Sequence, residues 1–308
     1  MVDADSRIIA TVIVTTRDRP ALARRAIGSA LDQSLRRVEV IAVDDGSAQP
    51  LDTSGLDVRL MRFEKSVGVC AARNAALEIA RGEWVLFLDD DDELMPTILE
   101  TSIAAASDSQ LPEPVSALSA MEFVDQEGSV LDKRIPVSMP RGAHYFLERV
   151  ESGRSLQVHN SLVAPLAVLR QVGGWDPDIG AWEHDDLFLR LNAVCSLQGV
   201  DDVGYRKTTT GFGQLSRDDL RLAEGMRKTE VKHRATFVAY PPKHAHFLRT
   251  MGMYYLKAGR WGRALQSTTR ALTCDVPAAK TIGYWFASLA GPGGLWCFRR
   301  AREFLRGT

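Results

Sequence analysis

The stretch Trp84-Val85-Leu86-Phe87-Leu88-Asp89-Asp90-Asp91-Asp92-Glu93 decides the fold, because a short apolar run leads directly into five acids. The apolar half is too short for a helix and follows Gly82, so it predicts a buried parallel strand. In open α/β sheets, ligands bind just beyond the carboxyl ends of the strands. Five adjacent carboxylates repel one another, and Mg²⁺ or Mn²⁺ would offset that repulsion by binding carboxylate oxygens. A solvated acidic turn is the alternative interpretation.

The residues before this stretch predict further strands and helices in alternation. Strands are predicted over 8–15, a β-branched run, and over 38–43 and 58–63. Apolar spacing of three and four predicts a helix over 21–31, and an Ala-rich stretch after a glycine predicts another over 68–80. Polar residues follow the first two strands: the turn Thr15-Thr16-Arg17, and the pair Asp44-Asp45. The alternation predicts an α/β fold with a doubly wound, mainly parallel sheet and right-handed crossovers. These polar residues would then lie along one edge of the sheet.

The C-terminal part predicts a helical extension after Pro241-Pro242, with helices over 246–258, 261–274 and 278–289. We therefore predict a catalytic domain over 1–240 and a basic helical region over 241–308. Residues 243–308 carry 11 Lys and Arg against two Asp and Glu, although the whole chain has a net charge of −1. The balanced total gives no case for nucleic-acid binding. The basic helices suggest a contact with an anionic membrane surface or a homodimer interface.

The cysteines and the apolar runs bear on location. Four cysteines are scattered without a CxxC pair, which predicts reduced thiols in a cytoplasmic protein. The polar start of the chain is not a signal peptide, and no apolar run has the length of a membrane span. We expect a cytoplasmic protein that can contact the inner face of the membrane peripherally through its basic tail, where aromatic residues and arginines mix over 285–300.

About the first 220 residues resemble glycosyltransferase family 2, whose members bind nucleotide sugars on the GT-A fold, a Rossmann-like sheet. Six segments carry the resemblance, in family order: Val-Ile-Val-Thr-Thr-Arg-Asp-Arg-Pro (12–20), Val-Asp-Asp-Gly-Ser (43–47), Gly-Val-Cys-Ala-Ala-Arg-Asn-Ala-Ala (68–76), Phe-Leu-Asp-Asp-Asp-Asp-Glu-Leu (87–94), Val-Gly-Gly-Trp-Asp (172–176) and Glu-His-Asp-Asp-Leu-Phe-Leu-Arg-Leu (183–191).

The resemblance implies an inverting transfer of a sugar from a nucleoside diphosphate donor, with a UDP-sugar expected, to a carbohydrate, lipid-linked or small-molecule acceptor. The family's Asp-x-Asp motif falls on Asp89 and Asp91, which would bind the divalent cation, with Asp90 near the donor. The other implied donor-binding residues are Thr15, Thr16, Arg17, Asp44, Asp45, Arg73 and Asn74. A surface ion pair for Arg73 and a helix cap for Asn74 are the structural alternatives.

The general base is less clear, because this chain departs from the family pattern Glu-Asp-x-Asp-Leu. Anchoring on Asp186-Leu187 places Glu183 on the Glu and His184 on the Asp that usually serves as base. We favour a carboxylate, Asp185 or Glu183, and keep His184 as a chemically acceptable replacement. Acids that merely favour the start of a helix are the structural alternative. The segment 208–217 also lacks the His that many relatives carry there.

Two other functions compete with sugar transfer. A catalytically silent nucleotide-sugar-binding or scaffolding relative would explain the missing Asp of the Glu-Asp pair. A sugar nucleotidyltransferase would carry a Gly-rich loop after the first strand, and residues 15–20 contain no glycine. Turnover of nucleotide sugars would distinguish an enzyme from a catalytically silent relative.

Overall fold

The computed structural model describes residues 7–145, 147, 150–209, 218–274 and 279–291. They form two compact units, one of residues 1–177 with 184–211 and one of residues 178–183 with 212–308. The segment 208–217 and the tail after 291 fall largely outside the described residues. The predicted domain boundary at 240/241 lies inside the second unit and stays a prediction.

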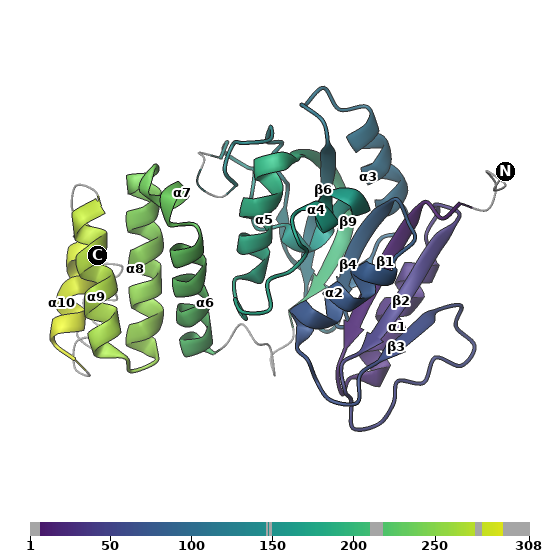
Figure 1. Ribbon diagram of the computed structural model, residues 1–308, viewed down its shortest axis with the longest axis horizontal. Coiled ribbons are helices and arrows are strands. Elements are labelled where there is room, and N and C mark those ends of the chain that lie inside the picture. The colour runs from purple at the N-terminus through teal and green to yellow at the C-terminus, as the bar shows by residue number, and fades with distance from the viewer. Residues whose placement is uncertain (1–6, 146, 148–149, 210–217, 275–278, 292–308) are drawn as a thin grey trace. The chain divides into compact units, whose positions relative to one another are not determined.

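The first unit is built on a single mixed sheet with the strand order β3-β2-β1-β4-β8-β6-β9-β5, and β7 pairs with β6 (Figure 1). The strands are β1 (Ala10–Thr16), β2 (Val38–Asp44), β3 (Arg59–Arg62), β4 (Trp84–Asp89), β5 (Glu93–Leu94), β6 (Val115–Val124), β7 (Val130–Arg134), β8 (Leu162–Pro165) and β9 (Ser196–Thr208). Strands β1 to β4 are parallel, as the sequence predicts. The antiparallel pairs of β8 with β4 and β6 turn the rest of the sheet into a mixed one.

The register of the parallel strands aligns their polar ends. Thr15 of β1 lies opposite Asp89 of β4, and Thr16 lies opposite Asp44 of β2. Every residue of β1 is buried, as expected for a central strand covered on both faces. The apolar strand bodies therefore form the core, and the polar residues meet at the carboxyl edge, as we expected from the sequence.

Helices of the first unit connect and cover these strands. They are α1 (Pro20–Leu31), α2 (Val69–Ile79), α3 (Ile98–Ser107), α4 (Leu166–Gln171), α5 (Glu183–Val194) and the short 3-10 turn η2 (His159–Ser161). Pro20 occupies the first turn of α1, where its missing N–H costs no hydrogen bond. The turn η2 directly precedes β8, which begins at Leu162.

The second unit is helical. Its helices are α6 (Asp219–Lys232), α7 (Arg234–Val238), α8 (Pro241–Lys257), α9 (Trp261–Cys274) and α10 (Ala279–Leu289). Helices α8, α9 and α10 pack side by side, and α6 packs on α8 (Figure 1). The prolines at 241 and 242 occupy the first turn of α8. Among the described helices, none has the length and hydropathy needed to cross a membrane.

Candidate donor and metal site

Asp89 stands at the end of β4 and is held by side chains from three other elements. Its Oδ1 accepts a hydrogen bond from Nη2 of Arg73 (2.6 Å), and its Oδ2 accepts one from Nδ2 of Asn160 (2.9 Å). The Nζ atom of Lys207 lies 3.6 Å from Oδ2. Burial alone would raise the pKa of Asp89, but the charges of Arg73 and Lys207 outweigh it and hold that pKa well below its usual value. Asp89 is therefore a fixed, ionised carboxylate.

Asp90 and Asp91 both contact the guanidinium of Arg19, the residue directly before α1. The Nη1 atom of Arg19 lies 3.2 Å from Oδ1 of Asp90 and 3.3 Å from Oδ2 of Asp91. The hydroxyl of Thr16 donates to Oδ2 of Asp90 (2.7 Å). Burial raises the pKa of Asp90 to about 6, and burial with the negative charge of Asp89 raises that of Asp91. These two acids thus have weaker cationic support than Asp89.

Asp92 also belongs to the acidic cluster at the end of β4. Its carboxylate is fully buried and accepts hydrogen bonds from the hydroxyl of Tyr205 (2.8 Å), Nζ of Lys207 (3.1 Å) and the backbone N–H of Thr208 (3.0 Å). All three donors come from β9, more than 110 residues later in the chain. Asp92 therefore ties the acidic turn to β9. Local sequence gave no signal for this contact.

Lys207 supplies the central positive charge of this turn. It contacts the carboxylates of both Asp89 and Asp92. Burial would lower its pKa, but the negative charges of these two residues raise it further, so Lys207 is protonated. The sequence analysis missed Lys207, because only the pairing of the sheet brings β9 to this edge.

Three carboxylates could hold a metal ion. Among the described residues, Asp89, Asp91 and Asp92 form the group whose ligand oxygens all lie within 4.8 Å of one another. Protein donors occupy both oxygens of Asp92 and both of Asp89, whereas the contact recorded for Asp91 is that of Arg19 with Oδ2. Hard oxygen donors at this spacing fit Mg²⁺ or Mn²⁺. Asp91 is the acid best placed to offer an oxygen, with Asp89 beside it.

The acids at the end of β2 have different partners. Asp44 is fully buried and accepts from the backbone N–H groups of Ser47 (2.9 Å) and Leu51 (3.0 Å), and from Arg62 (3.3 Å). Burial raises its pKa, but the hydrogen bonds from Ser47 and Leu51 lower it below the usual value. Asp44 thus builds its own loop.

Asp45 is similarly engaged. It accepts from the hydroxyl of Ser66 (2.7 Å) and from the backbone N–H groups of Val67 (2.7 Å) and Gly68 (3.1 Å). These bonds position the loop that enters α2, and Gly46 before it has a φ of +73° with the backbone N of Ser66 only 2.5 Å from where a Cβ would lie. The carboxylate of Asp45 therefore orders the loop that borders the predicted donor site.

The residues at the carboxyl end of β1 differ in exposure. Thr15 and Thr16 are buried, at 8% and 5% exposure, and Thr16 is committed to Asp90. Arg17 is exposed and pairs with Asp18 at 3.6 Å. Arg17 is thus available to solvent at the lip of the sheet, where a phosphate or ribose would approach.

Arg73 and Asn74 of α2 both meet Trp175. Arg73 is 3% exposed, and its guanidinium lies 4.4 Å from the centre of the Trp175 ring. The side chain of Asn74 forms two hydrogen bonds with the backbone of Trp175: Nδ2 donates to the carbonyl (2.7 Å) and Oδ1 accepts from the N–H (2.8 Å). Asn74 is therefore a clamp on the turn before α5 and not a helix cap. Arg73 points at Asp89, the acid nearest the predicted donor.

Residues 183–186 begin α5 and differ in surroundings. His184 packs edge-on against Trp175 (4.9 Å), and burial, followed by the charge of Arg73, lowers its pKa well below its usual value. Asp185 lies 3.7 Å from Nε2 of His159. Asp186 is fully buried and paired with Arg190 at 2.6 Å, so it is a structural ion pair. Glu183 belongs to the second unit.

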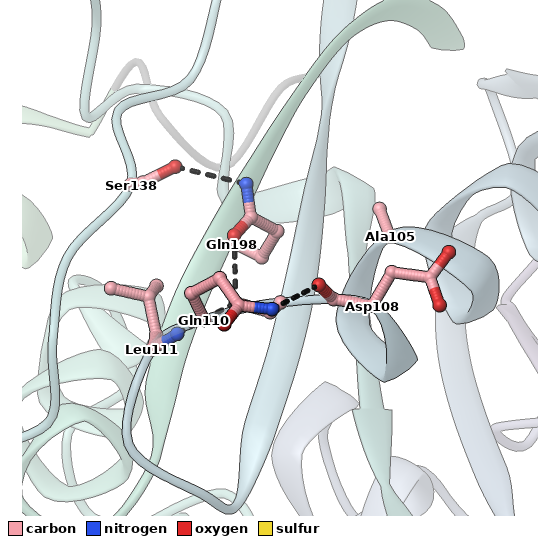
Figure 2. Close-up of a pocket in the computed structure, with 7 residues that line it drawn as sticks. Ala105, Asp108, Gln110, Leu111, Ser138 and Gln198 are labelled. Atoms are coloured by element: carbon pink, nitrogen blue, oxygen red, sulfur yellow. Dashed lines mark hydrogen bonds between the residues drawn. The ribbon is translucent and has the colours of Figure 1, made fainter.

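A pocket elsewhere in the first unit does not belong to this site. It lies at the end of α3 and the start of β9 (Figure 2) and is lined by Ala105, Asp108, Ser109, Gln110, Leu111, Ser138 and Gln198. The side chain of Gln198 accepts from Ser109 (2.8 Å) and donates to Ser138 (3.2 Å). The polar side chains that line the pocket thus form hydrogen bonds with one another. The pocket lies at the opposite end of β9 from Lys207.

Comparison with known proteins gives the chain a family. Residues 11–111 match the model of glycosyl transferase family 2. A putative colanic acid biosynthesis glycosyl transferase of Escherichia coli is 37% identical over 101 residues, which cover 30% of this chain and 36% of that protein. Over this segment the chain is similar to glycosyltransferase family 2. The family prediction is therefore confirmed.

Other relatives match this chain over longer stretches. A pre-mycofactocin glycosyltransferase of Mycobacterium tuberculosis is 28% identical over 194 residues, which cover 59% of this chain and only 38% of the relative. The structure of Staphylococcus aureus TarS 1-349 in complex with UDP-GlcNAc superposes with a TM-score of 0.56 at 19% identity, covering 92% of this chain and 80% of TarS. The likeness confirms the GT-A fold. The family match ends before residues 183–186.

Proposed function

We propose that this chain transfers a sugar from a nucleoside diphosphate donor, with UDP as the nucleotide, to an acceptor hydroxyl with inversion. The observation that carries the proposal is the cluster of Asp89, Asp91 and Asp92 at the carboxyl edge of the sheet, with Lys207 among them. The TarS structure contains UDP-GlcNAc, which supports the choice of nucleotide. The family match supports the reaction class.

The residues at the edge have separate tasks in this proposal. Asp91 and Asp89 would hold Mg²⁺ or Mn²⁺, which would neutralise the negative charge of the departing diphosphate. Arg73 and Lys207 fix Asp89 in its ionised form. The nucleotide-binding edge is formed or supported by Thr15, Thr16, Arg17, Asn74, Asp44, Asp45 and Asp90. Of these, Arg17 is the exposed cation that we expect to meet the donor.

We assign the general base to Asp185. Accepting a proton makes a buried imidazole charged, whereas it makes a carboxylate neutral, so burial opposes the first and favours the second. His184 is the buried imidazole in question, and Arg73 adds a further positive charge near it. Glu183 is the remaining carboxylate candidate at the start of α5.

The test of this base uses two matched variants. Asp185→Asn should lower kcat by about 10²–10⁴-fold with donor affinity unchanged, because general base catalysis is worth that factor. His184→Asn should lower kcat by less than about tenfold. The reverse ranking would move the base to His184, and equal small effects would move it to Glu183.

The test of the activity itself is release of nucleoside diphosphate from a panel of UDP-, GDP- and TDP-sugars with Mn²⁺. Turnover of a UDP-sugar with an acceptor, and loss of turnover on chelation of the metal, would support sugar transfer. No turnover and no binding of any donor would sink it. Binding without turnover with every acceptor would favour a catalytically silent relative, which the His at position 184 motivates.

We also propose that the acceptor is presented at an anionic membrane surface. Helix α10 exposes an apolar stripe of Ile282, Phe286 and Leu289, at 38%, 59% and 51% exposure. Together with the basic composition after residue 243, such a stripe suits anionic lipid. A Campylobacter jejuni relative named as acting on a polyprenyl-linked acceptor is 33% identical over 108 residues, 32% of this chain and 34% of that protein.

Vesicle co-sedimentation tests this surface. The protein should bind phosphatidylglycerol vesicles, and Phe286→Asp should lower the bound fraction by about tenfold. Phosphatidylcholine vesicles are the control for charge. A Phe286-dependent dimer in sedimentation velocity, without vesicle binding, would show that the stripe is instead a homodimer interface. A cytoplasmic location stays a prediction.

A further inference from the structure

A second cluster of ionisable side chains lies in the helical unit. Glu230 of α6 is 1% exposed and His244 of α8 is 4% exposed. The Nε2 atom of His244 lies 3.0 Å from Oε1 of Glu230. Its Nδ1 atom lies 3.6 Å from Sγ of Cys274, the last residue of α9. The imidazole therefore bridges a buried carboxylate and a thiol.

The carboxylate decides which nitrogen of His244 carries the proton. Burial raises the pKa of Glu230, but the hydrogen bonds from His244 and Arg270 outweigh it and bring the pKa to about 2, so Glu230 only accepts. Nε2 must then be the donor in the bond to Glu230. Nδ1 keeps its lone pair and faces the thiol. In this tautomer the imidazole can take the proton of Cys274.

Arg270 holds the carboxylate in place. Its Nη2 and Nη1 atoms lie 2.6 Å and 3.2 Å from the two oxygens of Glu230, and it precedes Cys274 by one helical turn on α9. The ring of Phe237 from α7 packs on His244 at 5.4 Å. Arg270 thus fixes the carboxylate that orients the His244 imidazole toward the sulfur.

The arrangement is a relay and not a chelate. His244 uses its two nitrogens toward different partners, so the thiol and the carboxylate do not converge on one point. Accordingly, the group of side chains in the described part of the chain that could hold a metal ion consists of Asp89, Asp91 and Asp92, and does not include His244. A carboxylate that orients an imidazole, which in turn contacts a nucleophile, is the general arrangement of an activated nucleophile.

The other described cysteines are less accessible to solvent. Cys70 and Cys195 are buried, whereas Cys274 is half-buried. Burial raises the pKa of Cys195, whose thiol contacts the hydroxyl of Ser116. Cys274 is therefore the described thiol that combines access from solvent with a neighbouring base.

We propose that Cys274 is an activated thiol and a modification site for small electrophiles of the peroxide class. His244 takes the proton from Sγ, and the thiolate attacks one oxygen of hydrogen peroxide. The S–O bond forms as the O–O bond breaks, which oxidises the sulfur to a sulfenic acid and reduces the peroxide. The departing hydroxide takes the proton from His244 and leaves as water. The imidazole returns to its neutral form.

The test is the pH-rate profile of alkylation by iodoacetamide, with each cysteine followed by mass spectrometry of its peptide. The full chain carries Cys297→Ser, because Cys297 lies outside the described residues. At pH 7, Cys274 in the folded protein should react on the order of tenfold faster than in urea, because an ordinary thiol has a pKa of about 8.5 and is a few per cent ionised there. Dimedone trapping after peroxide treatment should label the same peptide.

A matched pair of histidine variants assigns the base. His244→Gln should remove the rate advantage at pH 7, whereas His246→Gln, an exposed histidine on the same helix, should leave it unchanged. Equal rates for Cys274 in the folded and urea-unfolded protein, or equal losses in both variants, would overturn the proposal. If His244→Gln does not fold, the comparison of folded with unfolded unmutated protein still decides.

Discussion

The ends of β2 and β4 carry the same sequence signal, adjacent aspartates after an apolar strand, but they use it differently. Asp44 accepts mainly from backbone N–H groups of its own loop, and Asp45 from those of the loop that enters α2. Asp89 and Asp92 accept mainly from side chains of distant elements, with Lys207 between them. Backbone donors fix a loop, whereas side-chain cations balance charges that a bound ion can share. The hydrogen-bond donors around the aspartates, and not the aspartates themselves, therefore distinguish the structural loop at the end of β2 from the candidate site at the end of β4.

Asp91→Asn is the variant expected to have the largest effect. It removes the carboxylate best placed to bind a cation, so transfer should fall by about 10³-fold or more while the melting temperature in the absence of metal changes little. Nucleoside diphosphate release with and without Mn²⁺ measures it. Chelation of the metal from the unmutated protein should reproduce the loss. A variant that keeps full, chelator-sensitive activity would show that the cation lies elsewhere.

Asp44→Ala should instead damage stability. It leaves two buried backbone N–H groups and Arg62 without their acceptor, at a cost of about 2–4 kcal/mol in the free energy of unfolding. Because the folded pKa of Asp44 is lowered, its contribution is present above the ordinary carboxyl pKa and is lost as the pH falls below it. Urea denaturation from pH 7 to pH 3 should therefore show the difference between the two proteins shrinking. A constant difference would contradict this account.

Lys207→Met should sharpen the contrast between the two strand ends. It leaves the buried carboxylate of Asp92 without its ammonium partner, which should cost about 1–3 kcal/mol in the absence of metal. Added Mn²⁺ should then raise the melting temperature of this variant more than that of the unmutated protein, by mass action on the folded state. Asp44→Ala should show no such extra gain. Equal metal responses of the two variants would break the comparison.

Glu93→Gln should have the smallest effect. Glu93 pairs with Arg25 at 3.0 Å on the surface, with 37% and 42% of the two side chains exposed. Surface pairs of this kind contribute less than about 1 kcal/mol. Both activity and the melting temperature should remain within error of the unmutated protein. A loss comparable to that of Asp91→Asn would mean that the acids of this turn act as one undivided cluster.

The sequence predicted the strand ends well, and the reason is local. A short apolar run followed by acids specifies both a buried strand and its polar edge, so the parallel pairing of β1 with β2 and β4 followed directly. What it missed comes from long-range pairing. Asn160 and Lys207 reach Asp89 only because β8 and β9 join the sheet, 71 and more residues later. No local pattern encodes that contact.

Asn74 shows the same limit from the other side. Its position in a family-like segment suggested a place near the nucleotide, which stays a prediction. In the structure its amide is saturated by the backbone of Trp175, 101 residues away. Gly174 permits this approach, since it has a φ of +62° and a Cβ there would lie 2.4 Å from Oδ1 of Asn74. The glycine and the amide form one fitted contact that neither segment reveals alone.

The indole of Trp175 acts as a spacer of fixed thickness. Arg73 lies over it at 4.4 Å, and the rings of Phe87 and His184 meet it edge-on at 5.2 Å and 4.9 Å. Arg73 in turn donates a hydrogen bond to Asp89. Trp175 therefore connects the side chain that binds this acid to His184 in the first turn of α5. In the proposed reaction, the diphosphate departs near Asp89 and the acceptor proton is captured near the start of α5. Trp175 therefore sets the distance between these two places. A smaller residue at this position would leave both halves present and their separation undefined.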